Sequence, residues 1–280
     1  MDVTTKLKPF TKWTGGKRQL LDVLTPNMPE EYNTYYEPFI GGGALFFEIQ
    51  PESAVINDLN YDLILSYEAI KNNVSELIEY LKEHDENNSK EYYYDIRSAD
   101  RDGRYEEMSK TQKAARLMYM LRVNFNGLYR VNSKGQFNTP YGKYKNPKIV
   151  DEELLYAISE YLNTNNIQIL NTSFENAVKD AQAGDFVYLD PPYVPLSASS
   201  SFTAYTSNGF GYKEQILLRD TFVDLDNRGC FVMLSNSSAE LVYELYKDYE
   251  KTTLEVSANR MINSNAKKRG GVTELLIKNY

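Results

Sequence analysis

Cysteine, histidine and long apolar runs are nearly absent from this chain of 280 residues. Its single cysteine, Cys230, has no partner for an internal disulfide, which excludes a disulfide framework. No apolar run approaches the roughly 18 residues of a membrane span, and residues 1–8 lack the apolar core of a secretion signal. The one histidine, His84, lies among acidic residues in a helical stretch, which predicts a solvated side chain. We therefore expect a cytoplasmic protein that uses no membrane and no metal.

Acidic residues are also absent from two segments of a chain whose formal net charge is -8. Residues 110–148 contain nine Lys or Arg, residues 260–269 contain four more, and neither segment has an Asp or Glu. The rest of the chain then carries 18 basic and 39 acidic residues, a balance of -21. This separation indicates a surface that faces a polyanion. The alternative is a solvated basic face, but the aromatic and amide side chains within residues 124–144 favour nucleic acid.

Two nucleotide-binding signatures are incomplete. Gly16-Lys17 precedes an amphipathic run at 18–24, but a P-loop would need Ser or Thr next and another glycine five positions before Gly16. Further on, a strand at 34–37, a glycine-rich turn and a helix at 44–49 lead to a second strand at 54–56, a βαβ unit. A dinucleotide fingerprint would need a third glycine where Phe46 stands. A smaller nucleoside cofactor without a pyrophosphate therefore fits better than NAD.

The most informative stretch is Asp190-Pro191-Pro192-Tyr193, which directly follows the apolar run 186–189. This pattern predicts a buried strand that delivers a carboxylate to the carboxyl edge of a sheet. The prolines fix the turn and remove two amide donors, so Asp190 and the Pro191 carbonyl can accept the two hydrogens of a planar amine. Tyr193 offers a face for a base to stack on. The structural alternative is an ordinary proline-rich turn between a strand and a loop.

The order of elements predicts an α/β fold, a Rossmann-like domain with a helical insertion that bears a β-hairpin. The catalytic domain is expected at 1–60 and 149–280, and the insertion at 61–148, with its hairpin at about 123–144. Residues 195–211 have no helical period and predict a long mobile loop beside the site. The remaining predicted elements are helices near 151–162, 174, 212–226 and 239–246, and strands at 167–170, 186–189, 230–234, 254–256 and 274–277.

These motifs in this order resemble the Dam-type (D12 class) adenine-N6 DNA methyltransferases, most closely the double-strand GATC methylases of DpnII-type restriction-modification systems. The resemblance runs nearly from end to end of the chain. The motifs that carry it are Phe10-Thr11-Lys12-Trp13-Thr14-Gly15-Gly16-Lys17, Glu37-Pro38-Phe39-Ile40-Gly41-Gly42-Gly43-Ala44-Leu45-Phe46-Phe47, Arg122-Val123-Asn124-Phe125-Asn126-Gly127-Leu128-Tyr129-Arg130 and Asp190-Pro191-Pro192-Tyr193.

The resemblance implies S-adenosyl-L-methionine as the cofactor and S-adenosyl-L-homocysteine as the product. Asp58 suits the ribose hydroxyls, and Lys17 suits the methionine carboxylate. Relatives often carry Asp just before the aromatic residue Phe174, where this chain has Ser173, a weaker acceptor for the adenine amine. The positions expected to contact the cofactor are Trp13, Lys17, Phe39, Gly41, Gly43, Asp58, Phe174 and Asp190.

For the reaction, the resemblance implies that the target adenine is flipped out of the duplex, at a cost of roughly a few kcal/mol. Tyr193 then stacks on the base. Asp190 and the Pro191 carbonyl accept the N6 hydrogens and favour a nitrogen whose lone pair faces the methyl group. The expected catalytic residues are thus Asp190, Pro191 and Tyr193.

The expected partner is double-stranded DNA containing GATC. Arg130 suits bidentate contact with guanine, and Leu128 and Pro140 suit contact with a thymine methyl. Lys143, Lys145 and Lys148 suit contacts with phosphates. The full set of expected DNA-binding residues is Lys12, Arg122, Asn126, Leu128, Arg130, Pro140, Lys143, Tyr144 and Lys145.

The residues leave other functions open. Asp or Asn followed by Pro-Pro-Tyr also suits enzymes that methylate cytosine N4, RNA adenine or a glutamine amide. A relative that binds DNA without turnover is the rival from another class. We expect a monomer, with a dimer as the alternative.

Overall fold

A computed structural model describes residues 5–196, 210–259 and 271–280, and it divides the chain into two compact units. Unit 1 comprises residues 1–18, 41–50 and 60–171, and unit 2 comprises residues 19–40, 51–59 and 172–280. The domain boundaries expected from the sequence divide the chain differently and stay a prediction. Most of the predicted loop at 195–211 and the basic segment at 260–269 lie outside the described residues. Among those that are described, no helix is long and apolar enough to cross a membrane.

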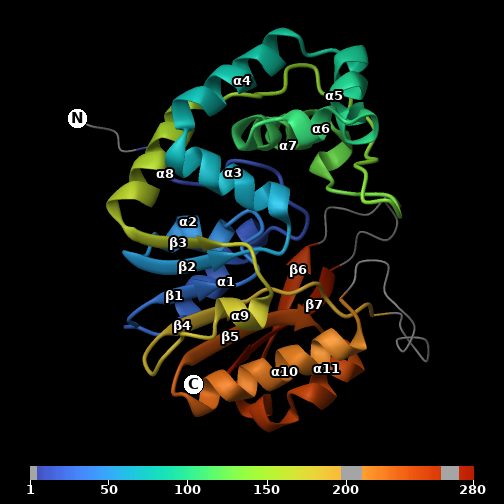
Figure 1. Ribbon diagram of the computed structural model, residues 1–280. Helices are drawn as coiled ribbons and strands as arrows, with labels where there is room; N and C mark the ends of the chain where they lie inside the picture. The colour runs from blue at the N-terminus through green and yellow to red at the C-terminus, as the bar shows by residue number, and fades with distance from the viewer. Residues whose placement is uncertain (1–4, 197–209, 260–270) are drawn as a thin grey trace. The chain divides into compact units, whose positions relative to one another are not determined.

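A seven-stranded sheet in the order β3-β2-β1-β4-β5-β7-β6 confirms the expected α/β, Rossmann-like class. Strands β1, β2, β4 and β5 are parallel, whereas β7 is antiparallel to both β5 and β6 (Figure 1). The strands are β1 (Tyr35–Glu37), β2 (Ser53–Asn57), β3 (Asn166–Leu170), β4 (Phe186–Leu189), β5 (Phe231–Ser237), β6 (Leu254–Asn259) and β7 (Gly271–Lys278).

Unit 2 forms its core between the central strands and α10. All four residues of β4 are buried, as expected for a parallel strand covered on both faces. Leu218 and Phe222 of α10 pack in one apolar cluster with side chains of β4 and β5, and the helix covers these strands in Figure 1. The helical segments of this unit are α1 (Leu21–Leu24), η2 (Thr25–Asn27), α9 (Phe174–Ala177), α10 (Tyr212–Asn227), α11 (Glu240–Leu245) and η4 (Lys247–Thr252). A further segment, η1 (Lys17–Leu20), has its first two residues in unit 1 and its last two in unit 2.

Unit 1 is built around α7, most of whose side chains are buried against α3 and α4 (Figure 1). Its start is fixed by a capping box, in which Ser109 and Gln112 each bond the other's backbone amide. The helical segments of this unit are α2 (Ala44–Ile49), α3 (Tyr61–Asn72), α4 (Val74–Glu86), α5 (Lys90–Asp102), α6 (Arg104–Glu107), α7 (Lys110–Val123), η3 (Phe125–Gly127) and α8 (Glu152–Thr164).

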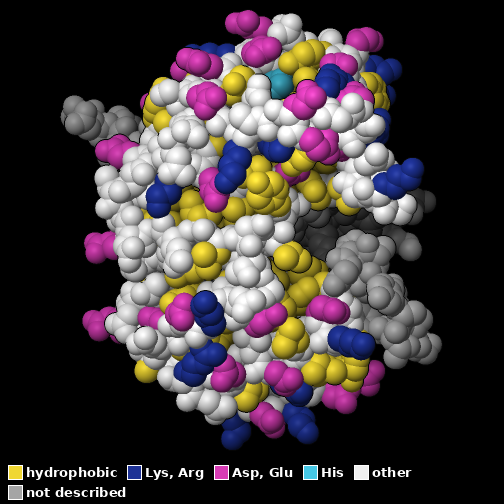
Figure 2. All heavy atoms as spheres, in the orientation of Figure 1, with side chains coloured by type: hydrophobic (Ala, Val, Ile, Leu, Met, Phe, Trp, Pro, Cys, Tyr) yellow, Lys and Arg dark blue, Asp and Glu magenta, His cyan; other side chains and the backbone are white. Residues whose placement is uncertain are grey.

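Only part of the positive charge of the acid-free segment 110–148 lies on the surface. Arg116 is only 3% exposed and donates to the carbonyls of Ile96 and Arg97, with Asp100 also nearby at 3.3 Å. The reason is that α7 is a core helix, so part of its charge serves internal bonds. On the face shown in Figure 2, Lys and Arg side chains lie interspersed with Asp and Glu. The exposed cations of the segment lie mainly after α7.

The predicted hairpin at about 123–144 is present only as a looped excursion with two isolated bridges, Asn124 to Tyr141 and Val131 to Phe137. Backbone bonds cross the excursion, from the Asn138 amide to the Arg130 carbonyl for example, and side chains of α5 add further support. Tyr93 and Arg97 both donate to the Thr139 carbonyl, at 2.8 and 3.0 Å. Because these bonds reach from another helix, the shape of the excursion depends on α5 as well as on its own turns.

His84 is a packed residue, so the expectation of a solvated side chain is wrong. Its ring stacks on Tyr119 with centroids 4.8 Å apart, and Nδ1 lies 2.8 Å from the Tyr92 hydroxyl. Burial, assisted by the positive charge of Arg116, lowers the pKa of His84 from 6.5 to about 4. The acidic sequence neighbours gave no signal of this packing because they point elsewhere on α4.

This packing predicts an acid-sensitive stability of unit 1. In the unfolded chain His84 takes a proton near pH 6.5, whereas the folded chain resists protonation down to about pH 4. The unfolded state therefore binds more protons in this window, and the free energy of unfolding falls as pH drops through it, by about 1–2 kcal/mol at pH 5. Urea unfolding at pH 7 and pH 5 measures the change. His84→Phe, which keeps a stacking ring, should remove this part of the pH dependence, and an unaltered dependence would contradict the assignment.

Candidate active site

The segment Asp190 to Tyr193 begins where β4 ends in unit 2. Since β4 is wholly buried, its chain emerges only at Asp190, whose side chain is partly exposed. The parallel neighbours β1 and β5 flank β4, so their carboxyl ends share this edge of the sheet. Asp190 thus lies at the edge expected from the sequence, while its catalytic role stays a prediction.

Three buried polar side chains hold the backbone that follows Asp190. Gln215 of α10 donates to the Pro192 carbonyl at 3.0 Å, and its own carbonyl oxygen accepts from Asn236 at 3.3 Å. Asn236 Oδ1 accepts from the Val194 amide at 3.2 Å, and Ser237 Oγ donates to the Val194 carbonyl at 2.6 Å. The turn is therefore fixed by hydrogen bonds to α10 and β5 in addition to its two prolines. The bond from Gln215 falls one residue beyond the Pro191 carbonyl that is predicted to accept an N6 hydrogen.

The phenol end of Tyr193 is also anchored. Its hydroxyl donates to Glu274 Oε2 of β7 at 2.9 Å. A second buried phenol nearby in the sequence, that of Tyr188, pairs with Ser235 Oγ at 2.9 Å. Burial, followed by the negative charge of Asp190, raises the pKa of Tyr193 well above its ordinary value, with Tyr188 and Glu274 adding to the shift. The Tyr193 phenol consequently stays protonated and able to donate.

Asn57, at the end of β2, joins three segments of unit 2 that contain predicted cofactor residues. Its Nδ2 donates to the carbonyls of Pro38 and Thr172, at 2.9 and 3.1 Å, and its Oδ1 accepts from the Thr172 amide at 2.9 Å. Its backbone carbonyl accepts from the Ile40 amide at 2.8 Å. The loop after β1, the end of β2 and the approach to α9 are thereby tied together next to Asp58, which is partly exposed.

The predicted aromatic residues of these segments meet. The rings of Phe39 and Phe174 lie with centroids 5.2 Å apart and planes at 30°, and Phe210 contacts both. Phe39 keeps part of its surface exposed, so a planar ligand has an apolar face to contact. Ser173 caps α9 with its backbone only, and its hydroxyl accepts from Asn176 Nδ2 at 2.9 Å.

In unit 1, Trp13 packs on the glycine turn before α2. A Cβ on Gly41 would lie 2.9 Å from Trp13 Cδ1, so only glycine permits this approach. The Gly41 carbonyl accepts from the Tyr67 hydroxyl at 3.0 Å. Gly43 begins α2 with φ of +68°, and a Cβ there would lie 2.7 Å from the same hydroxyl. The glycines predicted to admit a cofactor therefore also admit Trp13 and Tyr67.

Lys17 has a side chain that is largely buried. Its Nζ donates to the Gly15 carbonyl at 2.9 Å. The amine is therefore positioned by its own loop, and its proposed pairing with a carboxylate stays a prediction.

Lys12 and Tyr144, predicted DNA-binding residues from distant parts of the sequence, meet in unit 1. Lys12 Nζ lies 4.0 Å from the centre of the Tyr144 ring, a cation–π contact. Gly127 makes room for the lysine, since a Cβ there would lie 2.5 Å from Lys12 Cβ. The adjacent Trp13 packs on Tyr129 with centroids 5.2 Å apart. The N-terminal motif and the looped excursion therefore form one surface of this unit.

The other predicted DNA-binding residues differ in exposure. Arg122 is half-buried and donates to the Phe10 carbonyl at 3.0 Å, so it supports the N-terminal motif. Burial lowers the pKa of Arg122 from its usual value. Leu128 is partly exposed. The exposed members of the set are Asn126, Arg130, Pro140, Lys143, Tyr144 and Lys145.

Sequence reasoning missed the side chains that support these motifs. Gln215, Asn236 and Glu274 lie 23, 42 and 81 positions beyond the residues they hold, and no local pattern connects them. Phe125 was noted only as one aromatic among several, yet its ring is 53% exposed beside Asn126, a placement suited to contact with bases. Its position next to an Asn-Gly turn was the available signal.

Comparisons with known proteins identify the family of this chain. Residues 13–262 match the model of the D12 class N6 adenine-specific DNA methyltransferase family. The chain is similar to Type II methyltransferase M1.LlaDCHI of Lactococcus lactis subsp. cremoris, with 61% identity over 98% of this chain and 96% of the relative. It is also similar to Type II methyltransferase M.MjaIII of Methanocaldococcus jannaschii, at 42% identity over 98% of this chain and all of the relative. The DNA adenine methylase of Escherichia coli K12 is 34% identical over 97% of this chain and 95% of its own length.

The family match covers the glycine turn, the looped excursion and the Asp190 segment together. These comparisons confirm the resemblance seen in the motifs. The chain belongs to the D12 class N6 adenine-specific DNA methyltransferase family.

Proposed function

We propose that this chain transfers a methyl group from S-adenosyl-L-methionine to adenine N6 within GATC sites of duplex DNA, after flipping the target base. The observation that carries the proposal is the Asp190–Tyr193 turn at the carboxyl end of β4, held by Gln215, Asn236 and Ser237. A turn fixed in this way presents two oxygen acceptors and an aromatic ring in one preorganised group. Such a group recognises a planar amine attached to a ring.

At the target amine, Asp190 and the Pro191 carbonyl accept the two N6 hydrogens. Hydrogen bonds that draw these hydrogens out of the plane of the base favour a pyramidal nitrogen with an available lone pair. With cofactor bound, N6 would form a bond to the methyl carbon as the bond from sulfur to that carbon breaks; S-adenosyl-L-homocysteine would leave, and one N6 proton would be released to solvent. Tyr193 stacks on the base and holds it out of the duplex, offsetting part of the roughly few kcal/mol that flipping costs. Within an intact base pair the adenine N6 cannot reach Asp190 or the Pro191 carbonyl, which is the reason for flipping the base.

The cofactor residues of unit 2 fit S-adenosyl-L-methionine, which when bound supplies an electrophilic methyl group on a sulfonium. The Asp58 carboxylate, which follows β2 and is partly exposed, suits a nucleoside because it can accept hydrogen bonds from ribose hydroxyls. Phe39 and Phe174 pack on each other at 5.2 Å, and the exposed part of Phe39 would offer an apolar surface to an adenine ring. The roles of Trp13, Lys17, Gly41 and Gly43 toward the cofactor stay predictions, as do a monomeric state, a cytoplasmic location and independence from metal.

One assay tests the proposal against its rivals. Tritium-labelled S-adenosyl-L-methionine is incubated with two duplexes that differ only in whether they contain GATC, and the methylated base is identified after hydrolysis. We expect label in N6-methyladenine from the GATC duplex alone. Equal labelling of both duplexes would overturn the site, N4-methylcytosine would overturn the acceptor, and cofactor and DNA binding without label would indicate a non-catalytic relative.

The serine at position 173 predicts weakened cofactor binding. Its hydroxyl already accepts from Asn176 and is a weaker acceptor for an adenine amine than a carboxylate would be. We expect Ser173→Asp to tighten the binding of S-adenosyl-L-methionine by about 3- to 10-fold, the difference between a neutral and a charge-assisted hydrogen bond. Isothermal titration calorimetry measures the dissociation constant. Asn176→Ala is the matched control, and a dissociation constant unchanged by Ser173→Asp would sink the idea.

A further inference from the structure

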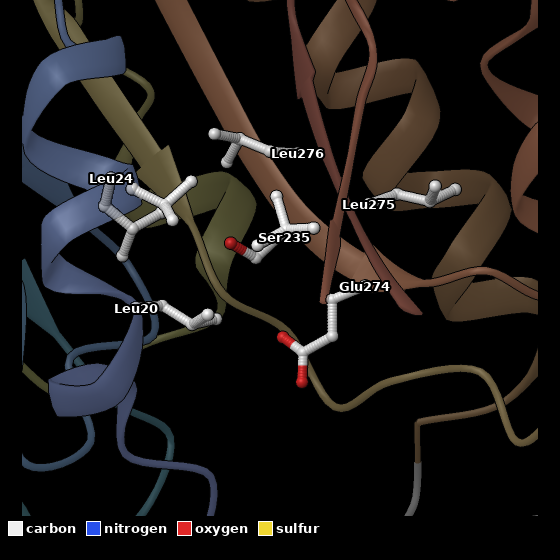
Figure 3. A pocket seen from close by; sticks show the side chains of 8 residues that line it. Leu20, Leu24, Ser235, Glu274, Leu275 and Leu276 are labelled. Carbon is white, nitrogen blue, oxygen red and sulfur yellow. The ribbon is translucent and has the colours of Figure 1, made fainter. Parts of the chain in front are cut away.

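Glu274 is an acid in an apolar setting. It lies on β7 opposite Ser237 of β5 and is only 9% exposed. Figure 3 shows its side chain at a small pocket whose other walls include Leu20, Leu24 and Ser235. Burying a carboxylate among leucines costs free energy that an apolar residue at this position would not incur. The hydrogen bond from the Tyr193 hydroxyl to Glu274 Oε2, at 2.9 Å, offsets that cost.

We propose that Glu274 is a positioning residue for methyl transfer, which acts by fixing the ring of Tyr193 in the orientation that stacks on the flipped base. The inference rests on the proposed stacking role of Tyr193. A phenol bonded to a carboxylate is held by a charge-assisted O–H···O bond, which is stronger and more directional than a neutral one. With Val194 held at its backbone by Asn236 and Ser237, the tyrosine is fixed at both ends.

Fixing the ring matters because reaction rates depend steeply on placement. A displacement of about 1 Å in a substrate-positioning group can reduce the rate on the order of 100-fold. A Tyr193 ring free to tilt would let the base tilt with it and carry N6 away from Asp190 and the Pro191 carbonyl. Glu274 touches neither base nor cofactor in this proposal, so its effect passes entirely through Tyr193.

The test uses four variants of the full chain. Tyr193→Phe removes the donor and keeps the ring, and Glu274→Leu removes the acceptor. Glu274→Gln keeps a neutral acceptor, and the double variant Tyr193→Phe with Glu274→Leu removes both partners. The readouts are the single-turnover rate of methyl transfer at saturating cofactor, the cofactor dissociation constant, and the fluorescence of a duplex with 2-aminopurine at the target adenine, which is quenched when the base stacks on an aromatic ring.

We expect Tyr193→Phe and Glu274→Leu each to lower the rate by about 10-fold or more, the value of one hydrogen bond to a charged group. The double variant should be no slower than the slower single variant, because both remove the same bond. Glu274→Gln should retain most of the activity. The 2-aminopurine signal should rise in Tyr193→Phe, in Glu274→Leu and in the double variant, while the cofactor dissociation constant of each stays within about threefold of wild type.

Glu255, on the neighbouring strand β6, supplies the matched control. Its carboxylate also accepts a hydrogen bond from a phenol, that of Tyr243 in α11. Glu255→Leu should leave the rate unchanged. Thermal unfolding of each variant separates a loss of stability from a loss of rate. If Glu274→Leu does not fold, Tyr193→Phe still decides the question, because full activity in that variant overturns the inference.

Other outcomes also overturn it. An unchanged rate in Glu274→Leu contradicts the inference, and so does a loss in the double variant equal to the product of the single losses. Tyr193→Ala distinguishes this failure from failure of the proposed function. If Tyr193→Ala is fully active, the stacking role itself is wrong; if it is inactive while Tyr193→Phe and Glu274→Leu are fully active, only the role of Glu274 is wrong.

Discussion

Replacing Asp190 by alanine is expected to lower the single-turnover rate of methyl transfer by at least about 100-fold, the loss seen when one preorganised polar group is removed from a reacting atom. Asp190 follows a strand that is buried at all four residues, so the carboxylate stands on a rigid support. Its removal takes away one of the two acceptors for the N6 hydrogens. Thermal unfolding of the variant shows whether the fold persists, because the charge of Asp190 also acts on the buried phenol of Tyr188 in β4.

The measurement must separate chemistry from binding, because Asp190 is also a predicted cofactor residue. Rates are therefore taken at saturating S-adenosyl-L-methionine, and the dissociation constants of cofactor and DNA are measured independently. Asp180→Ala, which alters an exposed acid in a turn, is the matched control and should be fully active. A rate for Asp190→Ala within about 10-fold of wild type would show that this carboxylate is dispensable for the reaction.

The sequence predicted the Asp190 turn because its signals are local. An apolar run of four residues, a carboxylate and two prolines specify a buried strand and a rigid turn with little help from the rest of the chain. The side chains that hold the turn were not predictable in the same way. Gln215 and Asn236 lie on α10 and β5, and only the packing of those elements against β4 brings their amides to Pro192 and Val194.

The same contrast explains the looped excursion of unit 1. The turn dipeptide Asn126-Gly127 indicates a turn in the sequence, and both of its residues adopt the left-handed backbone that this dipeptide favours. Backbone bonds cross the excursion at separated points, such as the Asn138 amide to the Arg130 carbonyl, without forming a continuous ladder, and bonds from Tyr93 and Arg97 of α5 to Thr139 add support from outside. Tertiary contacts overrode the local preference, as they often do for short β-prone runs.

Counting charges along the sequence indicated the right kind of partner but did not show which cations are exposed. A run without acids indicated a polyanion partner, and the family match establishes DNA as the substrate of this class. Counting along the sequence could not tell Arg116, which bonds the carbonyls of α5, from Lys143, which is exposed. The separation requires knowing which face of α7 packs inward. The helical spacing of Ala114, Met118 and Leu121 indicates a core helix, but an arginine at a core position carries no distinguishing pattern.

Two exposed cations of the excursion, Arg130 and Lys143, are expected to contact DNA in different ways. Arg130 Nε donates to Asn138 Oδ1 at 2.6 Å and Nη2 donates to the Asn138 carbonyl at 3.2 Å, so the guanidinium is oriented before DNA arrives. An oriented guanidinium suits bidentate contact with guanine, whereas the exposed Lys143 is a flexible point charge suited to phosphate. Base contacts carry sequence information and phosphate contacts do not.

We therefore expect Arg130→Ala to reduce the preference for GATC over a duplex with its guanine pair changed by about 10- to 100-fold, the value of one good bidentate contact. Lys143→Ala should weaken binding equally on both duplexes and reduce the slope of log affinity against log salt by about 1. Fluorescence anisotropy titrations at several salt concentrations measure both quantities. Lys90→Ala, at an exposed lysine of α5, is the control for a general loss of charge. If Arg130→Ala instead weakened binding equally on both duplexes, and Lys143→Ala reduced the preference for GATC, the two roles would be exchanged. The reason is that only a residue that contacts a base edge can change discrimination without an equal change of affinity on every sequence.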